Sequence, residues 1–225
     1  MRQSRAYLDA AEKRASGPRA WRQGIRSDPV QTTIRRAVSF SGIGLHTGAP
    51  VRMTIRPASP NHGIWFRRTD VVDGDRMVPA RFDAVTPSRL CTVVENAAGV
   101  GVSTIEHVMA ALSGTGIHNA LIDIDGPEVP ILDGSAAPFV SGILGRGLRE
   151  LDEPVRCLEI LETVEVREGD AVARLEPAAT LEMTFEIDFD DQAIGRQEKL
   201  PDSRSLLFFF FTDREPLILK PAVCR

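Results

Sequence analysis

Glu106 and His107 are adjacent residues near the start of an expected helix at 103–114, in the stretch VSTIEHVMAAL. A carboxylate can take a proton from water as a general base, and an imidazole is a common zinc ligand. The pair is therefore a candidate for half of a catalytic metal site. The same stretch also fits a capping box, with Ser103 as the N-cap and Glu106 bonded back to its amide, and that interpretation involves no chemistry. Spacing alone leaves both interpretations open.

The expected helix has two contrasting faces. One face carries large apolar side chains: Ile105, Val108, Met109 and Leu112. The opposite face carries a histidine and small residues: His107, Ala110, Ala111 and Gly114. The first face has the spacing of a helix that packs on its own sheet, and a helix that is apolar or small all round is usually buried on both sides. We therefore expect a second domain to cover the small-residue face, with His107 in the cleft between the domains.

Partners for His107 in a metal site are scarce. The chain has four histidines, and the other three are His46, His62 and His118. No two of them lie at H-x-x-x-H spacing, and none follows residue 118. A catalytic zinc ion needs three protein ligands. The sequence therefore offers one convincing ligand and no partner near it along the chain.

Other groups of polar residues are weaker candidates. The stretch DIDGPEVPILDGSAAPF holds four acidic residues: Asp123, Asp125, Glu128 and Asp133. The first two alternate within an expected strand, and the last reads as a turn before a second helix, so structural roles are favoured. The turn GIGLHTG lacks the Gly-Lys-Ser/Thr ending of a phosphate loop. Neither nucleotide hydrolysis nor a dinucleotide cofactor is supported.

The composition restricts the class of protein. A formal net charge of −4, without a basic stripe interleaved with aromatic residues, argues against nucleic-acid binding. Three cysteines without C-x-x-C spacing indicate neither a disulfide framework nor a cysteine zinc site, and they favour a reducing setting. No apolar run approaches the ~20 residues needed to cross a membrane. We expect a cytoplasmic monomer without a transmembrane segment.

The elements that must position the Glu-His pair form blocks along the chain. Residues 1–31 are rich in arginine and poor in apolar positions, which predicts a disordered basic extension. Residues 32–151 contain several short β-rich segments and two helical segments. This segregation predicts an α+β domain with two layers, a sheet and two helices on one of its faces.

The pattern of strands restarts at 154–194. TIRPA at 54–58 is similar to RLEPA at 174–178, and each follows comparable material. The similarity predicts an incomplete second copy of the first architecture. Residues 195–225, which include the run LLFFFF, show no clear period and are predicted to form an atypical tail.

Several longer stretches resemble one family. They are SGIGLHTG, TIRPA, FRRTD, LCT, STIEHVMAALSGTGIHNALIDIDGPEVPILDGSAAPF and, later, ETVEV with FEIDFD. Together, over about 33–194, they resemble UDP-3-O-acyl-N-acetylglucosamine deacetylase, the zinc amidohydrolase of lipid A biosynthesis. The resemblance implies a repeated α+β layer with an active site between two domains. It also implies a UDP-linked acylated amino sugar as the substrate and Zn2+ as the cofactor.

The resemblance assigns roles to particular residues. It implies that Glu106 is the general base and that His107 is a zinc ligand. It places Leu90 and Cys91 near the mouth of the acyl-chain passage, with His46 in the same neighbourhood. In the family, the remaining zinc ligands come from an H-K-x-x-D segment of the second domain and the general acid is a histidine there. This chain contains neither.

The sequence departs from the family pattern near Gly195, which predicts a truncated or frame-shifted copy. Because a site that loses two of three ligands loses most of its zinc affinity, we expect these 225 residues to be inactive alone. Two alternatives stay open. One is a non-catalytic binding or interaction module that keeps the first domain, and the other is an enzyme completed by a partner chain.

Overall fold

The computed structural model describes residues 30–88, 90–156, 160–169, 171–178, 185–188, 193 and 195–199. The predicted basic extension lies outside these residues except for Val30 and Gln31. Those two begin strand β1 (Val30–Ile34), and Gln31 is buried, so the extension ends earlier than predicted. The predicted tail lies outside the described residues beyond position 199.

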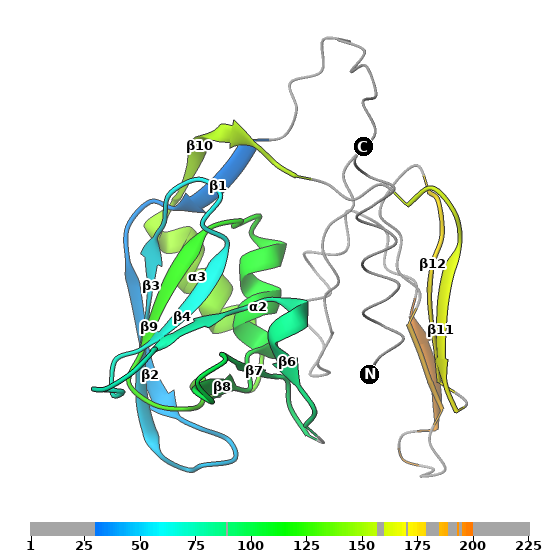
Figure 1. The fold of residues 1–225 in the computed structure, drawn as a ribbon, viewed down its shortest axis with the longest axis horizontal. Helices are drawn as coiled ribbons and strands as arrows, with labels where there is room; N and C mark the ends of the chain where they lie inside the picture. Colours follow the sequence, from blue (N-terminus) through cyan, green and yellow to red (C-terminus); the bar gives the residue numbers. More distant parts are fainter. Residues whose placement is uncertain are drawn as a thin grey trace.

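The largest sheet has five strands in the order β2-β3-β9-β4-β5 (Figure 1). Their bounds are β2 Val38–Ile43, β3 Pro50–Pro57, β4 Ile64–Arg68, β5 Met77–Pro79 and β9 Ala120–Ile124. All neighbours are antiparallel except β4 and β9, which are parallel. At the centre of the sheet, β9 therefore lies between β3 and β4, although both of these strands precede it by more than 50 residues in the chain.

Alternation along β3 shows why the sheet has one buried face. Val51, Met53 and Ile55 are buried, whereas Arg52 and Arg56, at alternate positions, are exposed. Successive side chains of a strand point to opposite faces, so the apolar set faces the core. The sheet is thus half buried, as the predicted sheet with helices on one face requires.

Two helices, α2 (Glu106–Gly114) and α3 (Ala137–Arg146), lie against each other and on the same side of this sheet (Figure 1). Apolar side chains of both helices join those of the sheet in one core. The described part is therefore a mixed α/β structure with several sheets and two helices.

The faces of α2 differ in one respect from the prediction. Val108 and Leu112 are buried as expected, but Ala111 is also fully buried, while Met109 is only partly buried. The buried stripe is therefore centred between positions 108 and 111, because the small alanine side chain belongs to the core. The prediction that Ala111 lies on a separate face, to be covered by a second domain, is therefore wrong.

Smaller elements complete the unit around the helices. A three-stranded sheet β6-β7-β8 follows a 3-10 turn, and β1 pairs with a late strand, β10. The bounds are η1 Phe82–Ala84, β6 Val85–Thr86, β7 Val93–Glu95, β8 Gly101–Ser103 and β10 Leu148–Pro154. Strand β8 ends three residues before α2 begins, so it fixes where the helix starts.

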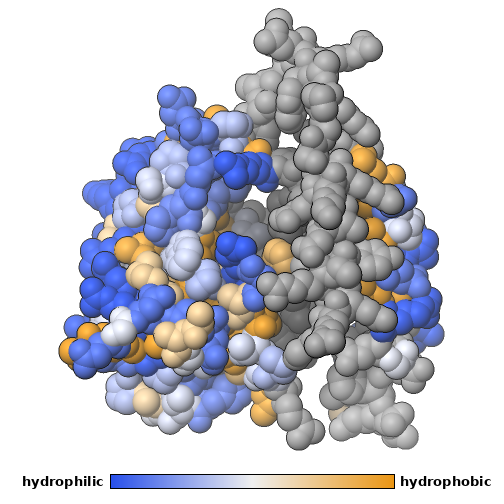
Figure 2. All heavy atoms as spheres, viewed as in Figure 1, coloured by the Kyte–Doolittle hydropathy of each residue, from blue (hydrophilic) through white to orange (hydrophobic). Residues whose placement is uncertain are grey.

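Two hairpins are described after residue 160. They are β11 (Val164–Glu168) with β12 (Ala171–Leu175), and β13 (Phe185–Asp188) with β14 (Arg196–Lys199). Exposed apolar side chains gather on the first hairpin (Figure 2): Val164, Val166, Val172 and Leu175. TIRPA covers the end of β3 and RLEPA covers the end of β12, so each segment closes the second strand of a hairpin. The internal duplication stays a prediction.

Within the described ranges, no helix is long and apolar enough to span a membrane.

Candidate active site

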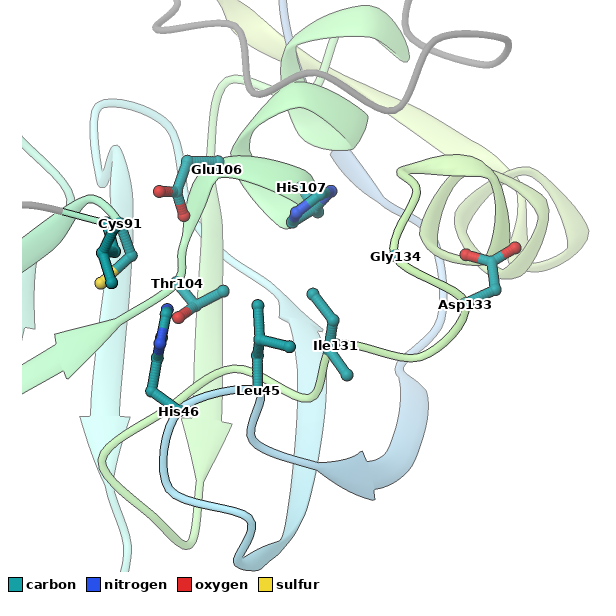
Figure 3. A pocket seen from close by; sticks show the side chains of 10 residues that line it. Leu45, His46, Cys91, Thr104, Glu106, His107, Ile131, Asp133 and Gly134 are labelled. Carbon is teal, nitrogen blue, oxygen red and sulfur yellow. The ribbon is translucent and has the colours of Figure 1, made fainter. Parts of the chain in front are cut away.

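A pocket of about 460 Å³ opens beside the start of α2 (Figure 3). Its lining residues come from four separate segments: Leu45, His46, Leu90, Cys91, Thr104, Glu106, His107, Ile131, Asp133 and Gly134. All five residues singled out in the sequence lie among them. Residues up to 89 positions apart in the chain are thus brought to one cavity, with Glu106 and His107 projecting from the first turn of the helix (Figure 3).

The start of α2 does not form the predicted capping box. Ser103 belongs to β8, and Ile105 occupies the N-cap position without a side-chain cap bond. The Ser103 hydroxyl donates instead to the carbonyl of Pro127 at 3.2 Å. Because β8 continues up to Ser103, that residue already pairs with the segment after β9, and the capping interpretation of Glu106 is wrong.

Glu106 has two carboxylate oxygens in different situations. Oε1 accepts a hydrogen bond from the backbone N–H of Thr92, next to Cys91 in the chain. Oε2 is buried and has no hydrogen-bond partner within the described part of the chain. A buried oxygen without a partner is costly, and such atoms in a native fold call for a functional explanation. The side chain is fixed through one oxygen and leaves the other available.

Glu128, only 1% exposed, lies behind the pocket and accepts several hydrogen bonds. The backbone N–H of His46 donates to Oε1 at 3.0 Å and to Oε2 at 3.2 Å. The N–H and hydroxyl of Thr47 both donate to Oε2 at 2.8 Å, and the hydroxyl of Thr104 donates to Oε1 at 2.8 Å. Burial disfavours the charged carboxylate, but these donors outweigh it and lower the pKa of Glu128 to about 2.

The glycines of the turn GIGLHTG make room for this carboxylate. A Cβ added at Gly44 would overlap both the Thr47 hydroxyl oxygen and a carboxylate oxygen of Glu128. Gly48 adopts a φ of +62°, the left-handed region that favours glycine. The turn that carries His46 therefore wraps closely around Glu128, and only a residue without a side chain fits at position 44.

Thr104 connects this cluster to the helix. It is 3% exposed and has a φ of +56°, a conformation that a β-branched residue rarely adopts. Such backbone strain costs about 1–3 kcal/mol and persists only where the surroundings impose it. In this conformation the Thr104 hydroxyl donates to Glu128 Oε1 at 2.8 Å. Two residues later the chain reaches Glu106.

The other acidic residues of this region have structural partners, as predicted. Asp123 accepts from Arg56 at 2.6 Å and from Arg67 at 2.6 and 2.9 Å, and these arginines lower its pKa against the opposing effect of burial. Asp125 accepts from the backbone N–H of Arg52. Asp133 accepts from both the N–H and the hydroxyl of Ser135 at 2.9 Å, which is a turn ahead of α3.

The described residues do not assemble a complete metal site. Among them, no group of three or more His, Cys, Asp or Glu side chains is placed to hold one ion. His118 accepts from the backbone N–H of Thr32 at 3.1 Å, and burial lowers its pKa. His62 forms a hydrogen bond with the Gly63 carbonyl. Neither lines the pocket, so His107 and His46 are the two imidazoles there.

Four lining residues were not identified from the sequence: Leu45, Thr104, Ile131 and Gly134. Asp133 was named there, but only as a turn residue. Leu45 is next to His46, and Thr104 lies two positions before Glu106. Their nearness in sequence to predicted site residues could therefore have identified them. The role of Glu128 was not foreseen, although the glycines on both sides of Leu45–Thr47 already indicated a close approach by some other group.

Comparison with known proteins identifies related sequences. The family profile described as LpxC, UDP-3-O-acyl N-acetylglycosamine deacetylase, matches residues 31–208. That region extends past Gly195, and the departure from the family pattern near that residue stays a prediction. A UDP-3-O-acyl-N-acetylglucosamine deacetylase of Phenylobacterium zucineum is 51% identical over 167 residues, which cover 74% of this chain and 57% of that protein.

Two further deacetylases of the same name show similar coverage. The protein of Pseudoalteromonas atlantica is 42% identical over 197 residues, which cover 82% of this chain and 64% of that protein. The protein of Vibrio cholerae is 43% identical over 183 residues, covering 80% of this chain and 57% of that protein. The chain thus spans between 57% and 64% of the length of these three relatives.

Proposed function

The chain belongs to the LpxC family of UDP-3-O-acyl N-acetylglycosamine deacetylases, and from this premise we propose that its pocket is the first-domain half of a zinc-dependent deacetylase site. The reaction would be hydrolysis of the N-acetyl group of UDP-3-O-acyl-N-acetylglucosamine, a step of lipid A biosynthesis in the cytoplasm. The observation that carries the proposal is the carboxylate of Glu106, next to His107 in the chain, whose buried Oε2 has no hydrogen-bond partner among the described residues.

Glu106 has the arrangement that a general base needs. Its Oε1 is held by the Thr92 amide, while Oε2 is buried and free to accept a proton. A base acts only from a fixed position within hydrogen-bond reach of the proton that it removes. We propose that Oε2 takes the proton from the attacking water, and that the Thr92 N–H holds the carboxylate in place before and after the transfer.

The zinc ion implied by the family fits the described residues in part. His107 is the nitrogen donor that would bind it, but a catalytic zinc ion needs three protein ligands, and no such group exists among the described residues. A bound zinc ion would acidify water and polarise the amide carbonyl. We propose that the missing ligands belong to a second-domain H-K-x-x-D segment, which the 225 residues do not contain, so that these residues alone bind zinc weakly and do not turn over.

The remaining pocket residues suit an acylated sugar. Leu45 and Leu90 are apolar side chains at the cavity with 58% and 81% of their surfaces exposed, and Ile131 is a partly buried lining residue. Exposed leucines at a cavity mouth gain from contact with an alkyl chain. We propose that Leu90 and Cys91 contact the acyl chain and that His46 contacts the polar part of the substrate.

A chimaera tests whether this half-site is competent. Residues 30–156 of this chain would replace the matching part of the P. zucineum deacetylase, and acetate release from UDP-3-O-acyl-N-acetylglucosamine and bound zinc would be measured. We expect turnover, with a loss of about 100-fold or more in Glu106→Gln because general-base catalysis contributes that much. The exposed Glu95→Gln is the matched control and should change little.

The outcomes separate the readings. A chimaera that folds and binds zinc but releases no acetate would favour a non-catalytic module derived from the first domain. Acetate release by the 225 residues alone, abolished in Glu106→Gln, would contradict the proposed dependence on further ligands while supporting the role of Glu106.

A further inference from the structure

We propose that Glu128 is a positioning residue, which locks the turn bearing His46 to the start of α2 and so fixes two walls of the pocket relative to each other. Its functional meaning rests on the deacetylase site proposed above. The geometry itself does not, because every contact involved belongs to this chain. Its side chain lies between two segments that are far apart in the sequence, the turn at His46 and Thr47 and the residue Thr104.

The hydrogen bonds of Glu128 run in two directions. Towards the turn they come from the N–H groups of His46 and Thr47 and the hydroxyl of Thr47, at 2.8–3.2 Å. Towards the helix the bond comes from the Thr104 hydroxyl at 2.8 Å. One carboxylate therefore accepts bonds both from the turn that carries His46 and from Thr104, two positions before Glu106.

The backbone around Glu128 holds the carboxylate in place. The N–H of Ser103 donates to the Pro127 carbonyl at 2.9 Å, and the N–H of Val129 donates to the Ser103 carbonyl at 3.1 Å. On the other side, the N–H of Ile131 donates to the Ile43 carbonyl at 3.0 Å. The segment from Pro127 to Ile131 is thus tied to the end of β8 and to the end of β2. Its position does not depend on the carboxylate alone.

This separation makes a positioning role distinguishable from simple support of the fold. Because backbone bonds hold the segment, removal of the carboxylate should release the His46 turn and Thr104 while leaving the rest of the unit intact. An uncharged glutamine keeps the shape and one accepting oxygen, and the Thr104 hydroxyl can rotate to accept from its NH2 group. Glutamine should therefore restore most of the arrangement that alanine destroys.

The four histidines are built-in probes for the test. His46 and His107 line the pocket, whereas His62 and His118 lie outside it, so the imidazole Hε1 resonances of the whole chain report on both regions in one proton NMR spectrum. Resonances would be assigned by single histidine substitutions. Spectra and amide exchange would be recorded without substrate or zinc for the wild type, Glu128→Ala, Glu128→Gln, Thr104→Val and the surface control Glu95→Gln.

We expect Glu128→Ala to shift or broaden the resonances of His46 and His107 only, and to speed exchange of the His46 and Thr47 amides roughly tenfold or more, since bonds to a charged acceptor are lost. Glu128→Gln should return both resonances close to their wild-type positions. Thr104→Val should affect His107 and leave His46 unchanged, because it removes the helix-side bond alone.

Two results would overturn the inference. Equal changes at all four histidines would make Glu128 a general support of the fold, and a change at His46 alone would show that it holds its own turn without coupling it to α2. Should Glu128→Ala fail to fold, the Thr104→Val and Glu128→Gln spectra decide between the same outcomes. Since no substrate is present, failure here leaves the proposed deacetylase reaction untouched, and the chimaera's failure leaves this coupling untouched.

Discussion

Two regions beside the pocket each hold a glutamate, and the two carboxylates differ in the number of hydrogen bonds that they accept. In the segment after β9, Glu128 is nearly inaccessible, and donors from three residues surround both of its oxygens. At the start of α2, Glu106 has one oxygen bound and the other buried without a partner in the described part of the chain.

The difference separates a carboxylate that organises a site from one that can react in it. A saturated carboxylate is stabilised as an anion and is a poor proton acceptor at neutral pH, as the lowered pKa of Glu128 indicates. In the proposed function, the unpartnered oxygen of Glu106 is the atom that takes the proton from water. The residue type is the same in the two regions, although Glu128 is buried and Glu106 only partly so, and the two carboxylates differ most in the number of donors that reach them.

The largest effect should come from filling the space beside Glu128. Gly44→Ala places a Cβ against the Thr47 hydroxyl and the Glu128 carboxylate, so we expect a loss of about 3 kcal/mol or more in the free energy of unfolding from overpacking and lost hydrogen bonds. Urea unfolding measures it. Gly145→Ala in α3, where nothing lies within 4 Å, is the matched control and should be neutral or slightly stabilising. Equal losses in both variants would mean that the close approach at Gly44 is unimportant.

The next effect is a pH dependence that only the saturated region should show. The pKa of Glu128 is lowered from 4.5 to about 2 in the folded state. A lowered folded pKa gives stability that is present above the unfolded value and is lost as pH falls towards the folded value. We therefore expect the wild type to lose up to about 3 kcal/mol from this group between pH 5 and pH 2.

The comparison with Glu128→Gln isolates that contribution. Asp70 and Asp123, whose pKa values are also lowered, titrate in both proteins and cancel in the difference. The stability gap between the wild type and Glu128→Gln, measured by urea unfolding at several pH values, should close as the pH falls below 5 and change sign towards pH 2, because the expected loss exceeds the gap of about 1–2 kcal/mol at pH 7. A gap that stays constant down to pH 3 would show that the carboxylate is not preferentially ionised in the fold.

Much of the pocket was predictable because its residues lie in recognisable sequence motifs. Glu106, His107, His46, Leu90 and Cys91 were all identified from motifs, and all line one cavity. The sheet with helices on one face was likewise predictable from alternation and helical spacing. Local patterns were sufficient where the contacts that determine the structure lie close together in the sequence. Motifs shared with a family were sufficient for the pocket residues.

The errors arose where distant contacts compete with local ones. The S-x-x-E spacing left a capping role open for Ser103, but its hydroxyl and backbone bond to Pro127, which is 24 residues away. The bonds that saturate Glu128 span 81–82 residues to the turn. Neither partner is visible in a local pattern, because only the fold brings these segments together. Which glutamate is saturated could therefore not be predicted from the sequence.

Thr104 offers a sharper test of the link between the two regions. Thr104→Val keeps the strained left-handed backbone and loses the bond to a buried anion, so we expect a loss of about 2 kcal/mol in unfolding free energy. Thr104→Gly loses the same bond but relieves the backbone strain, and should cost about 1 kcal/mol less than valine. Thermal and urea unfolding of both variants measure the order. A glycine variant less stable than the valine variant would indicate that the threonine is not strained.

The smallest effect should have the opposite sign. Glu106→Gln keeps an oxygen for the Thr92 N–H and replaces a buried, unpartnered carboxylate oxygen with a neutral group, so we expect the free energy of unfolding to rise by about 1 kcal/mol. Glu128→Gln, which gives up charge-assisted bonds, should lower it by about 1–2 kcal/mol. Glu95→Gln at the exposed end of β7 sets the baseline near zero. Urea unfolding at pH 7 compares the three. If Glu106→Gln lowers stability as Glu128→Gln does, its second oxygen has a partner in solution, and the contrast between a reactive and an organising carboxylate no longer holds.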